Sequence, residues 1–287
     1  MNNPPTGRFL RSGRVFWICS MVCLGSSIYY SLAYRIENQY LEKQVLSRLL
    51  NGNESPQEKL KLITLYVHTK RDFETTERIR YINPLFRFVK ATPRHVDELG
   101  GHCGNLARLT ISLLHLSGIQ ARKVHLYSEA SLLGPRKTAY VHAVVEAWIE
   151  DRWAVTDPAM GLIFHRIDGS PATVNDLSDA SFLSSQVGSD YDMGLFAYGE
   201  VRHIRWDKFT LGETFYNLVK NLFGKSFADS ISYPYWAERP YLVFSGMFFG
   251  LTCCFAVVAC LSKCGKQRNI DRISEQSPPV QYAHDSV

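Results

Sequence analysis

Two long apolar stretches, one toward each end of the chain, constrain its fold more than any other feature. Residues 15–34 and 241–261 contain no Asp, Glu, Lys or Arg, and each is about as long as a helix that crosses a bilayer. Because basic flanks favour the cytoplasmic side, we expect both termini in the cytoplasm and the intervening residues on the other side of the membrane. The flanking basic residues are Arg8, Arg11, Arg14, Lys263, Lys266 and Arg268.

Two other interpretations of these stretches remain open. They could be buried helices of a soluble core, although uncharged runs this long are uncommon there. The first stretch could instead be a cleaved signal peptide, because the segment Ser31-Leu32-Ala33 has small residues where a signal peptidase cuts. The second stretch would then still anchor the protein. A length of 287 residues with 46% hydrophobic content fits one folded domain plus membrane segments.

A cysteine begins the most apolar helix that the intervening sequence predicts. Leucines at 106, 109, 113 and 116 follow Cys103 with helical spacing, and Ser117-Gly118 forms a typical C-terminal cap. Free amides and the positive end of the helix dipole stabilise a thiolate in the first turn, so the pKa of Cys103 should be low. Gly100 and Gly101 can bend the chain and admit a substrate backbone. A small core cysteine is the alternative interpretation.

Residues 140–149 and 152–158 have the pattern of two strands joined by a tight turn. A two-residue loop at Glu150-Asp151 would put Trp148 opposite Trp153. His142 and Asp157 would then share one face as diagonal neighbours, about 7–8 Å apart at the backbone. Glu-Asp is an unusual sequence for such a turn, and a three-residue loop would place the two side chains on opposite faces.

These features resemble the core of the transglutaminase-like superfamily over residues 92–165. The resemblance is carried by a cysteine that opens a helix, the following Gly118-Ile-Gln-Ala-Arg122, a histidine that starts a strand, and a closing Trp-x-x-x-Asp-Pro. It implies a papain-like α+β fold, in which the helix carrying the cysteine packs on an antiparallel sheet. It also implies that Cys103 is the nucleophile, His142 the base and Asp157 the acid that orients it. Animal transglutaminases stabilise the oxyanion with an upstream tryptophan, whereas Trp17, the only one upstream here, lies in the first apolar stretch.

The distribution of cysteine and histidine argues against disulfide and metal sites. Cys103 is the only one of seven cysteines outside the apolar stretches and their cytoplasmic flank, so the intervening domain has no disulfide framework. Retention of a single exported thiol fits a catalytic use. The nine histidines show no paired metal-ligand spacing, so we predict no metal and no cofactor.

The charge pattern bears on partners. Residues 71–90 are rich in arginine and aromatic residues, and the chain has a net charge of +5. Outside the cytoplasm this segment is better explained as a solvated face, or as a contact with anionic glycans or headgroups, than as a nucleic-acid site. The aromatic and arginine cluster at 233–241 is predicted to anchor the chain at the membrane interface. Gly246 and Gly250 have the small-xxx-small spacing through which two copies could pair.

The sequence therefore predicts a membrane-anchored, extracytoplasmic cysteine enzyme, a hydrolase or acyltransferase that acts on an amide or ester through Cys103, His142 and Asp157. Its expected substrate is a peptide, a protein or a cell-envelope polymer, and no nucleic acid is involved. The alternative is a catalytically silent, membrane-tethered module that binds a peptide or glycan. The complete set of cysteine, histidine and aspartate favours the enzyme, since a binding module has no need of a lowered thiol pKa.

The predicted organisation has seven parts. In chain order these are a cytoplasmic N-terminus (1–14), a transmembrane helix (15–34), a stalk with packing helices (35–91), the transglutaminase-like core (92–165), a C-terminal extension of the ectodomain (166–240), a second transmembrane helix (241–261) and a disordered cytoplasmic tail (262–287).

Overall fold

The computed structural model describes residues 6–72, 91–127, 141–189, 191–192, 198, 201–206 and 211–275. The chain divides into two compact units. One comprises Ala33–Leu242, and the other combines the terminal segments Met1–Leu32 and Val243–Val287. Most of the arginine-rich segment 71–90, and residues 128–139 before the first predicted strand, lie outside the described residues.

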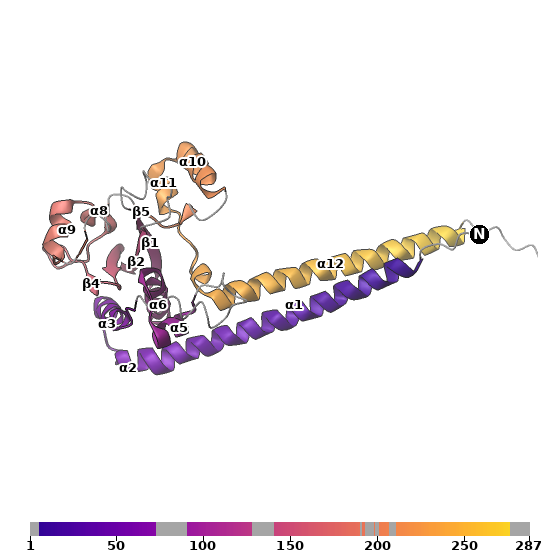
Figure 1. Ribbon diagram of the computed structural model, residues 1–287, viewed down its shortest axis with the longest axis horizontal. Coiled ribbons are helices and arrows are strands. Elements are labelled where there is room, and N and C mark those ends of the chain that lie inside the picture. Colours follow the sequence, from indigo (N-terminus) through magenta and orange to yellow (C-terminus); the bar gives the residue numbers. More distant parts are fainter. Residues whose placement is uncertain are drawn as a thin grey trace, which may run out of the picture. The chain divides into compact units, whose positions relative to one another are not determined.

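An antiparallel sheet of five strands organises the unit Ala33–Leu242 (Figure 1). The strand order is β4-β3-β2-β1-β5, so the first and second strands of the predicted hairpin, β2 and β3, lie at its centre. The strands are β1 (Ala121–Tyr127), β2 (Val141–Ile149), β3 (Arg152–Asp157), β4 (Leu162–Ile163) and β5 (Val201–Arg202).

Short helices and one long buried helix surround the sheet. The buried helix is α6 (Cys103–Leu116), which ends at Ser117 and Gly118 as predicted. Before it, α3 (Pro56–His68) begins with a capping box between Ser55 and Glu58. The remaining helices of this unit are η1 (Leu41–Leu46), α2 (Ser47–Leu49), α5 (Pro93–Leu99), α8 (Val174–Leu177), α9 (Ala180–Gln186), α10 (Gly212–Phe223), α11 (Lys225–Ser230) and η4 (Tyr235–Glu238).

The two faces of the sheet bury different parts of the chain. Alternate residues of β2 face one core, in which Ala143, Val145 and Ala147 pack with the leucines of α6 and with α3. The other face carries Val144, and there the chain after β3 supplies the cover, including Phe164, Leu177, Leu183 and Tyr198. The predicted α+β arrangement, with the cysteine helix packed on an antiparallel sheet, is confirmed.

The β2–β3 hairpin has the predicted register. Trp148 lies opposite Trp153, with ring centroids 5.2 Å apart. Glu150 and Asp151 form the two-residue loop, and both adopt left-handed backbone angles, with φ of 52° and 59°. Such angles belong to the hairpin turn whose twist matches the strands. The side chain of Gln57 donates a hydrogen bond of 2.6 Å to Glu150, which helps to hold a turn whose sequence does not favour it.

The terminal unit is a pair of antiparallel helices. They are α1 (Thr6–Tyr40), which continues into the first unit, and α12 (Pro240–Glu275), and both meet the length and hydropathy expected of a membrane-spanning helix (Figure 1). The tail predicted to be disordered from residue 262 is instead helical as far as Glu275. Lysine, glutamine and arginine favour a helix there, and the sequence has no proline before Pro278.

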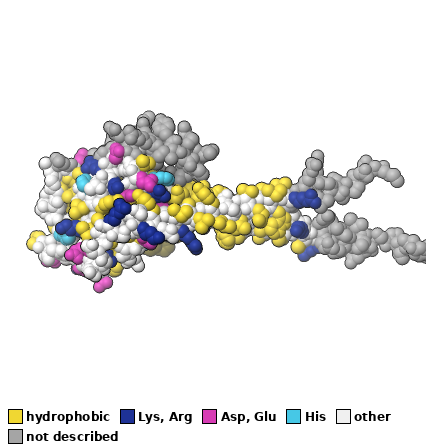
Figure 2. Space-filling view, turned by 90° about the horizontal axis from the view of Figure 1, so that it is seen from below, with side chains coloured by type: hydrophobic (Ala, Val, Ile, Leu, Met, Phe, Trp, Pro, Cys, Tyr) yellow, Lys and Arg dark blue, Asp and Glu magenta, His cyan; other side chains and the backbone are white. Residues whose placement is uncertain are grey.

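Polar side chains face inward in this helix pair, and apolar side chains face outward. Ser27 donates to the carbonyl of Ser245 at 2.9 Å, and Ser245 donates to the carbonyl of Ser27 at 3.1 Å. The outward-facing side chains are mostly aliphatic or aromatic, and Figure 2 shows them as a continuous apolar band. This distribution of side chains is the reverse of that in a soluble helix pair, and it suits helices whose surroundings are apolar. A Cβ added to Gly246 or Gly250 would meet nothing within 4 Å, so neither glycine is used in this contact, and pairing of two copies through them stays a prediction.

Candidate active site

Cys103 is the first residue of α6, where the chain leaves an extended segment. His102 occupies the N-cap position with φ of −90° and ψ of 176°. Because the first amides of a helix have no carbonyl partner one turn earlier, the Cys103 and Gly104 amides point out of the helix beside the sulfur. Cys103 itself is partly exposed. A nucleophile at this position therefore has both solvent access and nearby hydrogen-bond donors.

The two glycines before His102 are required by a close approach of the chain to itself. Gly100 ends α5 with φ of +81°, and a Cβ there would lie 2.8 Å from the carbonyl oxygen of Lys70. The Gly101 amide donates to the same carbonyl at 3.1 Å, and the Asp72 amide donates to Gly101 at 3.1 Å. The expectation that these glycines admit a substrate backbone is therefore corrected, because residues 70–72 of the same chain occupy that space.

His142 and Asp157 form a buried pair at the centre of the sheet. The Nε2 atom of His142 lies 2.7 Å from Oδ2 of Asp157, whose side chain is fully buried. The other oxygen of Asp157 accepts hydrogen bonds from the amides of Ala159 at 3.0 Å and Met160 at 3.2 Å. These amides fix the carboxylate, and the carboxylate fixes the imidazole ring. The placement of His142 beside Asp157 was predicted from the two-residue turn at Glu150-Asp151.

The sulfur of Cys103 meets the same imidazole. Since Nε2 of His142 faces Asp157, a proton exchanged with the sulfur is carried by Nδ1. Burial alone would raise the pKa of Cys103, but hydrogen bonds from His102, His142 and the Ala143 amide, together with the charge on His142, lower the pKa to about 5. Burial likewise opposes the charge on His142, yet Asp157 and Cys103 raise its pKa to about 10. The pair is thus held as thiolate and imidazolium at neutral pH.

His102 contributes to the site although the sequence did not single it out as functional. Its side chain lies close enough to the sulfur of Cys103 to lower the pKa of the thiol. Its ring also lies over the first turn of α6, since a Cβ added to Gly104 would be 3.6 Å from Cε1 of His102. The signal available in the sequence was a histidine directly before the proposed nucleophile.

Two buried tyrosines near Asp157 were also not predicted. Burial raises the pKa of both Tyr191 and Tyr198, and the carboxylate of Asp157 adds to the effect. The Tyr191 hydroxyl donates to that of Tyr198 at 3.3 Å. They belong to the apolar cover on this face of the sheet. They separate Asp157 from solvent, which strengthens its attraction for the imidazolium.

A cluster of buried charges holds the chain that leads into α12. Arg239 is fully buried and pairs with Glu37 at 3.1 Å. The preceding Glu238 pairs with Lys123 at 2.6 Å and with Arg108 of α6 at 3.3 Å. We call these five residues the anchor cluster. Interfacial anchoring was predicted for this segment, and for Arg239 that prediction is wrong, because its guanidinium faces buried carboxylate rather than headgroups. Trp236 remains exposed, as an interfacial residue would be.

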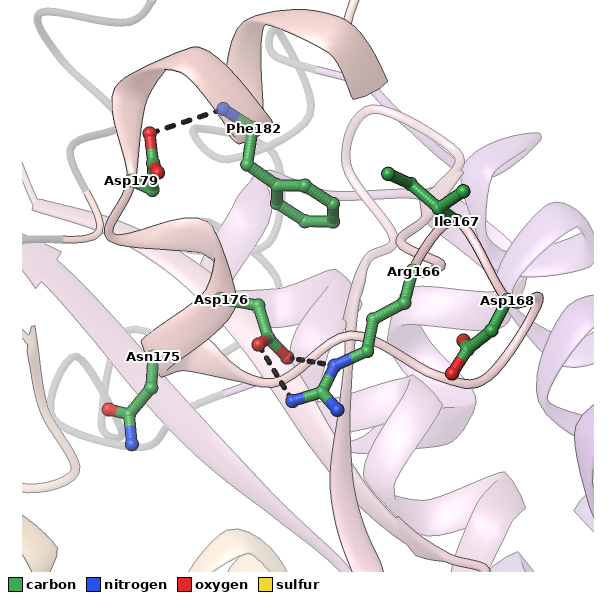
Figure 3. A pocket seen from close by; sticks show the side chains of 7 residues that line it. All are labelled: Arg166, Ile167, Asp168, Asn175, Asp176, Asp179 and Phe182. Atoms are coloured by element: carbon green, nitrogen blue, oxygen red, sulfur yellow. Dashed lines mark hydrogen bonds and ion pairs between the residues drawn. The ribbon is translucent and has the colours of Figure 1, made fainter.

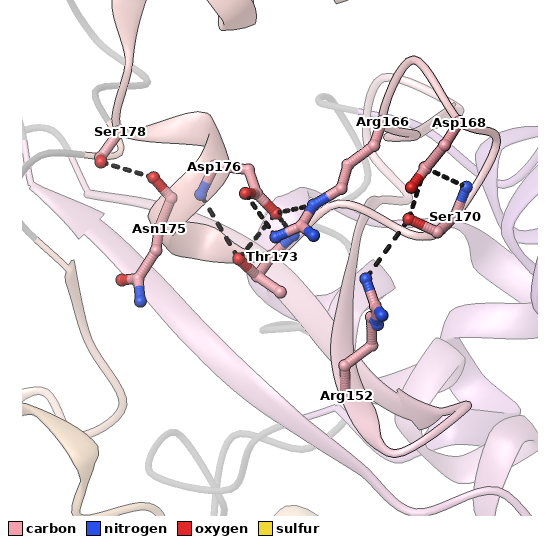
Figure 4. Close-up of polar contacts among 8 residues, drawn as sticks. All are labelled: Arg152, Arg166, Asp168, Ser170, Thr173, Asn175, Asp176 and Ser178. Carbon is pink, nitrogen blue, oxygen red and sulfur yellow. Dashed lines mark hydrogen bonds and ion pairs between the residues drawn. The ribbon is translucent and has the colours of Figure 1, made fainter.

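A shallow hollow of about 640 Å³ lies elsewhere in the unit (Figure 3). None of the three predicted site residues lines it. Its charged groups are engaged locally, since Arg166 makes two hydrogen bonds to Asp176, of 2.9 and 2.7 Å, and Asp168 accepts from Ser170 (Figure 4). The charged groups that line the hollow are therefore already occupied by local hydrogen bonds. These are Arg166, Ile167, Asp168, Asn175, Asp176, Asp179 and Phe182.

No group of three or more histidine, cysteine, aspartate or glutamate side chains is arranged to hold a metal ion within the described ranges. The chemistry available at Cys103 is that of a sulfur nucleophile paired with an imidazolium.

Comparison with known proteins gives one match. Residues 43–158 match the family model of the transglutaminase-like superfamily. No curated protein and no solved structure matches the chain. The match starts well before the predicted residue 92, and the structure explains why, since η1 and α3 pack against α6 in one core. The predicted resemblance is thereby confirmed. The chain therefore contains a transglutaminase-like domain, matched over residues 43–158.

Proposed function

We propose that the protein is a membrane-anchored cysteine enzyme that cleaves or transfers the acyl group of an amide or ester. The proposal rests on one observation above all. A fixed carboxylate, Asp157, lies 2.7 Å from the imidazole of His142, and the same imidazole lowers the pKa of Cys103 at the start of α6. A thiolate, a proton donor and an orienting acid are the parts that acyl transfer by cysteine requires.

In the first half of the proposed reaction, the thiolate of Cys103 adds to the carbonyl carbon of the substrate. The carbonyl oxygen becomes an oxyanion, and the free Cys103 amide donates a hydrogen bond to it. His142 then gives the proton on Nδ1 to the leaving nitrogen or oxygen as the bond to carbon breaks. The products of this half are a thioester on Cys103 and a free amine or alcohol.

In the second half, water or an amine attacks the thioester carbon. Neutral His142 takes a proton from the attacking group at Nδ1, and collapse of the oxyanion expels the thiolate of Cys103. Attack by water gives hydrolysis, and attack by an amine gives transamidation. Asp157 stays ionised throughout and stabilises the imidazolium whenever it forms.

We propose His102 as the second oxyanion donor. The superfamily's upstream tryptophan has no counterpart in the domain, so a donor beside the Cys103 amide has to come from another residue. The side chain of His102 already reaches the sulfur, and its ring covers the first turn of α6, beside the outward-pointing amides. An oxyanion on a carbon bonded to that sulfur would lie within reach of both donors.

We further propose that α1 and α12 cross the membrane with both termini in the cytoplasm, so that the enzyme acts outside the cytoplasm. The apolar outer face of the helix pair supports a membrane location, and the flanking basic residues support the orientation. A substrate outside the cytoplasm would be a peptide, a protein or a cell-envelope polymer. A reporter fused after Val287 and a second one inserted between residues 128 and 139 should report opposite sides of the membrane, and the same side for both would overturn the orientation.

The enzymatic proposal is tested by labelling the full-length protein in detergent with a carbonyl-containing, thiol-reactive probe, such as a peptidyl aldehyde, and mapping the adduct. We expect the adduct on Cys103 and its complete loss in Cys103→Ala. The matched control is Cys264→Ala, which removes an exposed cysteine and should leave the adduct unchanged. Reaction spread over several cysteines, or retained in Cys103→Ala, would contradict the proposal.

A further inference from the structure

A stripe of exposed apolar side chains runs along α10 and continues onto α11. Leu211, Phe215, Leu218 and Leu222 follow spacings of four, three and four residues, so they share one side of the helix. Together with two further phenylalanines they are each between 51% and 73% exposed. We call this the α10–α11 stripe; its six members are Leu211, Phe215, Leu218, Leu222, Phe223 and Phe227.

The stripe is concentrated, unlike the other exposed apolar residues of the same unit. Among the described residues of Ala33–Leu242, the remaining exposed large hydrophobic side chains are scattered through the chain. Scattered exposure is normal on a soluble surface, whereas a contiguous patch of this kind marks a contact. The scattered residues are Ile36, Leu65, Trp148, Ile167 and Trp236.

The two helices are held in place by their other side. Tyr216 and Val219 of α10 pack with Ala228 of α11 over Ile204 and Trp206. The Tyr216 hydroxyl also donates to Asp229 at 2.8 Å, and His203 lies 2.6 Å from the carbonyl oxygen of Asp229. The stripe is therefore a fixed surface of a packed element, and it is not a helix that failed to bury its core-facing side.

The charged residues of α10 and α11 lie outside the stripe. Glu213 pairs with Arg202 at 3.2 Å, and Asp229 pairs with Lys225 at 3.1 Å. Lys220 is exposed on the side of α10 opposite the stripe. A fixed helix with an apolar exposed side and charged residues elsewhere is the pattern of a helix that lies in a membrane interface.

Chain connectivity supports a bilayer as the occupant rather than a distant partner. Only residues 231–239 separate α11 from α12, and such a segment spans at most about 30 Å when fully extended. The α12 helix begins at Pro240 and has the length and hydropathy of a membrane span. If α12 crosses a bilayer, α10 and α11 cannot leave the vicinity of its surface.

We propose that the α10–α11 stripe docks on the surface of the bilayer that α1 and α12 span. The proposal rests on the proposed membrane location of those two helices and goes beyond the proposed reaction. Leu211, Phe215, Leu218 and Leu222 enter the headgroup boundary of the bilayer. A docked hairpin would restrain the domain against the membrane and bias it toward substrates held near that surface.

The test places a photo-crosslinking amino acid, p-benzoylphenylalanine, at one position at a time in the full-length chain. The protein is reconstituted in vesicles of equal parts phosphatidylcholine and phosphatidylglycerol, and lipid adducts are counted by mass spectrometry. Leu222 is the test position. Asn217, exposed on the opposite side of α10, is the matched negative control, and Phe249, exposed on α12, is the positive control for membrane insertion.

We expect lipid adducts at Phe249 and at Leu222, several-fold more than at Asn217. Leu218→Glu should reduce the yield at Leu222 several-fold, and Asn221→Glu should not. Adducts at Phe249 without adducts at Leu222 would overturn the docking proposal. Crosslinks from Leu222 to a second copy would overturn it as well, in favour of a protein contact. Absence of lipid adducts at Phe249 would instead overturn the membrane location on which the proposal rests.

Discussion

Two groups of buried charges in the domain have opposite consequences. At the site, Cys103 is partly exposed, and the imidazolium of His142 interacts with both Cys103 and Asp157. In the anchor cluster, every charged side chain is almost completely buried and each pairs with another member, as Arg239 does with Glu37. The first group can exchange a proton with a substrate, whereas the buried side chains of the anchor cluster cannot.

The difference shows that burial of charge alone does not identify a catalytic site. A site needs a charged group with one side fixed by the protein and another side open to a ligand. Cys103, next to the imidazole, is accessible to a ligand, whereas the charged side chains of the anchor cluster are buried against one another. We therefore expect changes at the site to alter reactivity and changes in the anchor cluster to alter stability.

The largest expected effect on stability is that of Arg239→Met. Removal of the guanidinium leaves the carboxylate of Glu37 buried without its partner, which should cost about 3–5 kcal/mol of unfolding free energy. Urea unfolding of the full chain in detergent measures this, and the alkylation rate of Cys103 in the folded protein should stay unchanged. The matched control is Arg94→Met, whose ion pair with Glu98 is exposed and should contribute less than about 0.5 kcal/mol. A loss for Arg239→Met as small as that of the control would remove the distinction between the two groups.

The next effect separates oxyanion stabilisation from thiolate formation at the site. His102→Ala should slow acylation of Cys103 by an activated ester by about a hundredfold, the usual cost of one oxyanion donor. Alkylation by iodoacetamide at pH 8 forms no oxyanion and should change little, because His142 still favours the thiolate. His102→Gln keeps a donor and should recover part of the acylation rate. Equal losses in the two reactions would mean that His102 acts only on the sulfur.

A smaller effect is expected for Asp157→Asn. The amide keeps the size of the side chain and can still accept from Ala159 and Met160, so the melting temperature should move by only a few degrees. It carries no charge to hold the imidazolium, so probe labelling at neutral pH should fall by at least about tenfold. Asp151→Asn, in the exposed turn, is the control and should leave labelling unchanged. Unaltered labelling in Asp157→Asn would remove Asp157 from the site.

The sequence was sufficient for the parts of the domain where one strong pattern fixes the geometry. The leucines of α6 and the Ser117-Gly118 cap predicted that helix, and strand parity placed His142 and Asp157 on one face. The turn at Glu150 and Asp151, which decides the faces on which the strand residues lie, was the weakest step of the prediction. Both residues have left-handed backbone angles, for which such turns usually use asparagine or glycine. Its geometry follows from the strands on either side and from the contact with Gln57.

Other features depend on contacts that sequence patterns do not encode. The role of Gly100 became visible only with Lys70 beside it, because the two residues lie far apart in sequence. Arg239 was expected at the membrane interface, and its partner Glu37 lies near the other end of the domain sequence. The α10–α11 stripe was not predicted, because that part of the chain was interpreted only as an extension. Apolar residues on both sides of α10 do not tell by themselves which side is buried.

The pH dependence of Cys103 alkylation tests the thiolate–imidazolium pair most directly. A pKa lowered to about 5 means that the sulfur is ionised above that pH, and a pKa of about 10 for His142 means that its charge persists until the solution becomes strongly basic. The iodoacetamide reaction, measured as the rate difference between the wild type and Cys103→Ala, should therefore rise with a midpoint near pH 5 and be flat through neutral pH. In His142→Ala the midpoint should move up toward the value of about 8.5 for a free thiol. A wild-type midpoint already near that value, and unmoved by His142→Ala, would contradict the account.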